Sequence, residues 1–119
     1  MTVFSWLLVG HFLGDWLLQN DWMARGKKEG VLTASGLAHF TIYTFVTMVA
    51  LLIAGIAEKG SLFVWGVATF IFVSHWIIDS TPLVDHWMKL YGQTDIAMVR
   101  VMVDQTFHLL VLVGISLVL

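Results

Sequence analysis

Three pairs of histidine and aspartate have the spacing that brings an imidazole and a carboxylate to the same side of a helix. The members of each pair are four positions apart: His11 with Asp15, His75 with Asp79, and Asp104 with His108. Residues with this separation are neighbours on a helix surface. All six lie in strongly apolar segments, and a further apolar segment contains His39. Ionisable groups in such segments are costly, so a functional role is their default interpretation.

Imidazoles and carboxylates without thiolates suit Zn, Mn or Fe, and the chain contains no cysteine. We expect one or two divalent ions, because a single zinc needs fewer ligands than the sequence offers. Gln19 and Gln105 are expected to hold the metal ligands in place. The predicted metal ligands are His11, Asp15, His39, His75, Asp79, Asp104 and His108.

The elements that position these residues are predicted to be membrane helices. Hydrophobic residues make up 59% of the 119 positions, more than a small soluble domain can bury. We predict an all-α integral membrane four-helix bundle, formed by a single transmembrane domain over residues 1–119. A span needs about 20 mostly apolar residues. The predicted spans cover residues 2–19, 31–57, 61–82 and 96–119.

The connections between the spans predict the orientation of the bundle. Residues 24–30 are expected to form a loop and residues 85–95 a short surface helix, and together these connections hold most of the Lys and Arg. Such loops face the cytoplasm, so both termini are expected outside. Two pairs are in the order His then Asp, whereas the pair in the last span is reversed. Because that span runs in the opposite direction, like groups are expected at like depth, near the cytoplasmic face.

Two further patterns concern packing and symmetry. Gly10 and Gly14 form a pair of small residues that lets another helix approach closely. His11, Asp15 and Asp21 share their spacing with His75, Asp79 and Asp85, which suggests two related helical hairpins.

The chain also resembles a known family. The stretch His11-Phe12-Leu13-Gly14-Asp15-Trp16-Leu17-Leu18-Gln19 is followed by Asp21-Trp22-Met23, His39, Ser74-His75, Asp79 and Asp104-Gln105-Thr106-Phe107-His108. This pattern resembles the small bacterial and phage membrane proteins called domain of unknown function 3307. A looser similarity is to bacterial membrane-bound metal-dependent hydrolases, although their motif is incomplete here. The first resemblance implies membrane character, and the second implies a bacterial inner membrane and, by analogy, a hydrolase.

The function predicted from the sequence is a metal-dependent hydrolase of a lipid or lipid-linked phosphate. The alternatives are an ion- or proton-coupled transporter, a haem-binding electron carrier, and a non-catalytic membrane subunit with a structural metal. Residues 49–57 and 109–119 contain almost no polar side chain, which disfavours transport, and three aspartates disfavour haem. The expected partners are the lipid bilayer, a lipid substrate and a second copy of the chain. The formal net charge of −2 indicates no nucleic acid partner.

Overall fold

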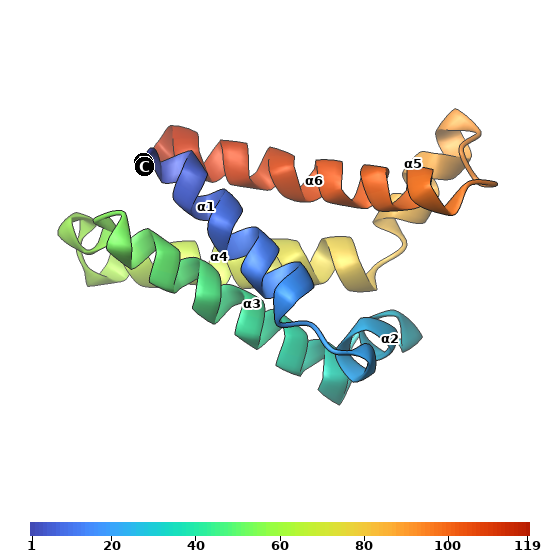
Figure 1. The fold of residues 1–119 in the computed structure, drawn as a ribbon, viewed down its shortest axis with the longest axis horizontal. Helices are drawn as coiled ribbons and strands as arrows, with labels where there is room; N and C mark the ends of the chain where they lie inside the picture. Colours follow the sequence, from blue (N-terminus) through green and yellow to red (C-terminus); the bar gives the residue numbers. More distant parts are fainter.

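The computed structural model describes all residues from Met1 to Leu119, and every regular element in it is helical, which confirms the all-α prediction (Figure 1). The chain forms six α-helices, one π-helical segment and one 3-10 helix. In chain order the elements are α1 (Val3–Phe12), η1 (Leu13–Leu17), α2 (Asp21–Glu29), α3 (Ala34–Ile53), η2 (Ile56–Lys59), α4 (Ser61–Ser80), α5 (Leu83–Tyr91) and α6 (Ala97–Val118).

Three of these helices are long and apolar enough to cross a membrane. They are α3, α4 and α6, each with a mean hydropathy of 1.8 over its most apolar window. The predicted first span is shorter, because α1 and η1 together cover Val3–Leu17. Fifteen residues rise about 22 Å, less than the roughly 30 Å of a bilayer core. The chain turns early because Asn20 caps the next helix, its side chain accepting from the backbone N–H of Met23.

The short helices and the chain ends lie at opposite ends of the molecule. Figure 1 shows α2 and α5 at one end, and the η2 turn and the C-terminus at the other. The start of α1 lies beside the C-terminal end of α6 (Figure 1). The two connections that carry most of the basic residues therefore share one end, which is the relative arrangement that the sequence predicts.

Close packing of α1 against α3 depends on the two predicted small residues. A Cβ added to Gly10 would lie 2.8 Å from Cα of Thr47, and one added to Gly14 would lie 3.0 Å from Cα of Tyr43. These distances are too short for a side chain, so the glycines allow the two backbones to approach. The packing role predicted for this pair is confirmed.

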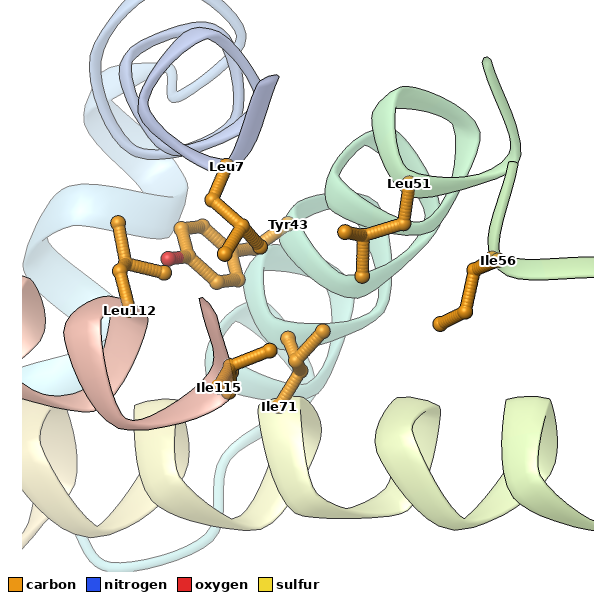
Figure 2. Close-up of a cluster of buried hydrophobic side chains, with 7 residues drawn as sticks. All are labelled: Leu7, Tyr43, Leu51, Ile56, Ile71, Leu112 and Ile115. Carbon is orange, nitrogen blue, oxygen red and sulfur yellow. The ribbon is translucent and has the colours of Figure 1, made fainter. Parts of the chain in front are cut away.

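An apolar core fills the half of the bundle toward η2. Figure 2 shows seven buried side chains that meet there. They come from α1, α3, η2, α4 and α6: Leu7, Tyr43, Leu51, Ile56, Ile71, Leu112 and Ile115. Tyr43 marks the border with the polar half, because its ring stacks on His75 at a centroid distance of 3.6 Å. This apolar core therefore separates His75 and the polar side chains around it from the η2 end of the bundle.

The loop predicted over residues 24–30 is wrong, because most of it belongs to helix α2. Met23, Gly26 and Lys27 have the spacing of one helix face, and all three are buried. A Cβ on Gly26 would lie 1.5 Å from Oγ of Ser35, so α2 packs almost directly on the start of α3. The short helix predicted within residues 85–95 is confirmed as α5, although it begins earlier, at Leu83.

The two halves of the chain have a similar plan. Each has an apolar helix, a short helix with one buried face, and a long apolar helix. The short helices also match in detail, since Met23 and Met88 are buried whereas the preceding Trp22 and Trp87 are exposed. This agrees with the spacing shared by the two halves of the sequence.

Candidate metal centre

Four of the predicted ligands converge between η1, α3 and α4. Nε2 of His39 lies 3.2 Å from Oδ1 of Asp15 and 3.3 Å from Oδ2 of Asp79. Nε2 of His75 lies 3.6 Å and 3.3 Å from the same two oxygens. The two nitrogens are 2.8 Å apart, and all four residues are buried. Two imidazoles and two carboxylates thus direct one atom each toward a common point.

The spacing of these four atoms matches the ligand shell of a tetrahedral metal ion. Metal–ligand bonds of about 2.0–2.1 Å give ligand–ligand distances of about 3.3–3.4 Å in a tetrahedron. The five separations between these atoms given above run from 2.8 to 3.6 Å, on either side of that value. The group could therefore hold a metal ion with small movements of its side chains.

Helix η1 explains how Asp15 reaches this point from the shortest of the apolar helices. The segment Leu13–Leu17 is π-helical, and the N–H of Leu18 donates to the carbonyl of Leu13 at 2.9 Å. The wider turn changes the direction of the side chains that follow Gly14. Single π turns of this kind occur frequently at functional sites.

Lys27 also belongs to this polar cluster, although the sequence predicted a loop at its position. Its ammonium donates to Oδ2 of Asp79 at 2.6 Å and to Oδ1 of Asp15 at 3.5 Å. Burial would lower the pKa of Lys27, but the carboxylates of Asp79 and Asp15 outweigh burial and raise it, so the amine stays protonated. The backbone is fixed as well, since Ser80 Oγ donates to the carbonyl of Lys27 at 2.6 Å. The helical spacing of Met23, Gly26 and Lys27 was the signal that could have revealed it.

His108 and Asp104 extend the cluster from helix α6. Nε2 of His108 lies 3.2 Å from Oδ1 of Asp79, and Nδ1 of His108 donates to the backbone carbonyl of Asp104 at 2.9 Å. A carboxylate oxygen of Asp15, one of Asp104 and a ring nitrogen of His108 all lie within 4.8 Å of one another. Asp104 is only partly buried.

His11 is outside the four-ligand group formed by Asp15, His39, His75 and Asp79. Both of its ring nitrogens have hydrogen-bond partners. Its Nδ1 is 3.0 Å from the Tyr43 hydroxyl and its Nε2 is 2.8 Å from Oε1 of Gln105. The amide of Gln105 donates to Oδ2 of Asp15 at 2.9 Å and to Oδ2 of Asp104 at 3.3 Å. Gln105 therefore ties His11 to two carboxylates, as a residue that positions ligands would. No hydrogen bond or ion pair joins Gln19 to the cluster, and its buried Oε1 has no partner.

A polar cavity of about 300 Å³ reaches the cluster from the end that carries α2 and α5. Its lining includes Asp79 and Asp104 from the cluster, together with Lys28, Asp85 and Arg100. Arg100 also forms an ion pair with Asp85, which ties α6 to α5. The cluster is thus accessible from this end, whereas the core around Leu112 closes the other.

Fold and site together define an all-helical protein with three helices of membrane-spanning character and a buried cluster of histidine and aspartate. The chain belongs to the family described as Protein of unknown function (DUF3307), whose model matches residues 3–119. No curated protein and no solved structure shows a significant match to the chain.

Proposed function

We propose that the protein is a metal-dependent membrane hydrolase whose divalent ion is bound by Asp15, His39, His75 and Asp79. The observation that carries this proposal is the near-tetrahedral arrangement of two imidazole nitrogens and two carboxylate oxygens beside a polar cavity. A divalent ion held by these residues, with a fifth position open toward the cavity, would act as a Lewis acid and would lower the pKa of a water bound there. That chemistry generates a nucleophile for hydrolysis at neutral pH.

The charge of the cluster supports a divalent cation. Three carboxylates and one ammonium, those of Asp15, Asp79, Asp104 and Lys27, sum to −2 when the histidines are neutral. Uncompensated charge is very unfavourable in a buried site. One divalent ion would make the cluster neutral. Lys27 can keep its hydrogen bonds to Asp15 and Asp79 when the ion binds, because a carboxylate oxygen has two lone pairs and can both accept a hydrogen bond and bind an ion.

Asp104 is the residue best placed to act as general base. Its carboxylate lines the cavity and is outside the four-ligand group, so one of its two oxygens can accept a proton from water even when the other has a partner. Ser80 and Arg100 border the same cavity and offer donors to a polar headgroup. A lipid or lipid-linked phosphate would present its headgroup here while its chains remain in the bilayer.

Location and partners follow from the same features. Lys28, Arg25 and Lys89 lie on α2 and α5, so we propose that this end faces the cytoplasm of a bacterial inner membrane and that both termini face outward. Helices α4 and α6 leave most of their apolar surface uncovered, which lipid or a second copy of the chain would cover. Transport is less well supported, because the core around Leu51 and Ile71 provides no polar path to the opposite end.

Metal analysis tests the proposal. Protein purified in detergent without chelator should contain Zn, Mn or Fe, and it should release phosphate from lipid phosphates until a chelator is added. Replacing both His75 and Asp79 by Ala should remove the metal and the activity, whereas His86→Ala, at an exposed position on α5, should change neither. Wild-type protein without stoichiometric metal would overturn the proposal.

A further inference from the structure

The ring of His108 has one nitrogen that the hydrogen bonds of the protein leave unexplained. A carbonyl oxygen can only accept, so Nδ1 of His108 carries the proton that it donates to the carbonyl of Asp104. In a neutral ring, Nε2 then has a free lone pair. This nitrogen is buried, has no hydrogen-bond partner and lies 3.2 Å from Oδ1 of Asp79, which also has none. Two buried acceptor atoms at this distance repel each other, and either a proton on Nε2 or a metal ion between them removes the repulsion.

The two central carboxylates present their second oxygens toward this region. Oδ1 of Asp15 faces His39, whereas Oδ2 of the same group faces Gln105 on α6. Asp79 has the same arrangement, since its Oδ2 faces the α3 and α4 histidines and its Oδ1 faces His108. Each carboxylate therefore extends between two groups of nitrogen and oxygen atoms, as a bridging ligand does.

Asp104 completes the second group. One of its oxygens lies within 4.8 Å of atoms of both Asp15 and His108. The amide nitrogen of Gln105 donates to Asp104 and to Asp15, so a neutral group alone holds these two carboxylates together. Lys27 donates to the carboxylate oxygens of Asp15 and Asp79 that face the first group. One ion at the first site balances the total charge of the cluster, but it lies on the α3 and α4 side, and no Lys or Arg forms an ion pair with Asp104 on the α6 side.

We propose that a second divalent ion binds on this side, with His108 and Asp104 as terminal ligands and Asp15 and Asp79 as bridges to the first ion. This inference rests on the proposed function, because the bridges are ligands of the first site. Paired ions in hydrolases of phosphate esters are about 3.5–4 Å apart, a separation that one carboxylate spans.

The second ion also specifies a class of substrate. With three carboxylates, Lys27 and two divalent ions, the centre carries a formal charge of +2. Such a centre favours an anionic group, and the cavity lined by Asp79 and Asp104 leads to it. A phosphate ester is anionic and would balance this positive charge, whereas an amide or a carboxylic ester is neutral and would not.

Titration with Mn²⁺ tests the inference independently of activity. Wild-type protein in detergent, stripped of metal by chelator, should bind about two Mn²⁺ per chain, and electron paramagnetic resonance should show an exchange-coupled pair. His108→Ala should bind half as much and give the hyperfine sextet of an isolated ion. His86→Ala is the matched control for loss of an imidazole and should behave as wild type, because His86 is exposed on α5.

Asp104→Asn provides a second variant of nearly unchanged shape at a partly exposed position. It should also halve the bound Mn²⁺ and remove the exchange coupling, which decides the matter if His108→Ala fails to fold. One uncoupled ion in wild type, unchanged in both variants, would overturn the second site and leave the proposed function standing. No bound Mn²⁺ in wild type would overturn both.

Discussion

The ammonium nitrogen of Lys27 lies 2.6 Å from Oδ2 of Asp79, and this contact joins the short helix α2 to the buried end of α4. Both side chains are more than nine-tenths buried. The lysine therefore neutralises part of the charge of the cluster in the absence of metal. Its position makes α2 part of the site, although α2 is outside the three helices of membrane-spanning character.

Lys27→Met should destabilise the metal-free protein by about 3–5 kcal/mol, because it removes one partner of a buried ion pair. Added divalent metal should recover much of this loss, since the ion supplies positive charge at the same carboxylates. Thermal unfolding in detergent, with chelator and then with Zn²⁺, measures both effects. Lys28→Met is the matched control, because Lys28 is exposed, and it should unfold as wild type does. An unchanged melting temperature for Lys27→Met in chelator would contradict the role given to Lys27.

Gly26→Ala should cost about 1–3 kcal/mol by overpacking the contact between α2 and α3. The added Cβ would lie 1.5 Å from Oγ and 2.5 Å from Cβ of Ser35. Combining it with Ser35→Gly should restore a substantial part of the stability, which a double-mutant cycle of unfolding free energies measures. Gly66→Ala serves as the control, because a Cβ there meets nothing within 4 Å. Equal losses in the single Gly26 variant and the double variant would show that this contact is not the cause.

The ion pair of Asp85 with Arg100 should make stability depend on pH. The hydrogen bond from Arg100 lowers the pKa of Asp85 in the folded protein. The unfolded chain therefore binds the proton more readily, so this contribution is present above about pH 4 and is lost as the pH falls through the folded value. Because both side chains are nearly half exposed, the effect should be below about 1 kcal/mol.

Asp85→Asn isolates that contribution. The difference in unfolding free energy between wild type and the variant should be present near neutral pH and shrink toward about pH 3. Chemical unfolding in detergent at both pH values provides the comparison. A difference that grows as the pH falls would have the wrong sign for a carboxylate with a lowered pKa.

The orientation in the membrane can be tested with single cysteines, since the chain has none of its own. Glu29→Cys and His86→Cys should react with an impermeant maleimide only after the inner membrane is opened, whereas Lys59→Cys should react in intact spheroplasts. A reporter fused after Leu119 should be active outside the cytoplasm. The physical reason is the excess of Lys and Arg on α2 and α5. The reverse labelling pattern would contradict the predicted orientation.

Periodic features of the sequence were sufficient to predict much of the architecture. Long apolar runs predicted α3, α4 and α6, because hydrophobic length and composition are local properties. The four-residue spacing placed His75 and Asp79 on one helix face, and Gly10 with Gly14 predicted a close helix contact, because both patterns depend on a single helix. The convergence of charged groups was expected because hydrocarbon is a poor solvent for them.

Tertiary structure decided which charged groups form the cluster and in what roles. Lys27 lies in a segment with the composition of a loop. Its burial depends on contacts from two other helices, because Ser35 packs against Gly26 and Ser80 donates to the carbonyl of Lys27. His11 has the same spacing to its aspartate as His75, yet Tyr43 and Gln105 occupy its nitrogens. Such differences arise because a sequence pattern specifies the face of one helix, whereas the partners of a side chain depend on how separate helices pack together.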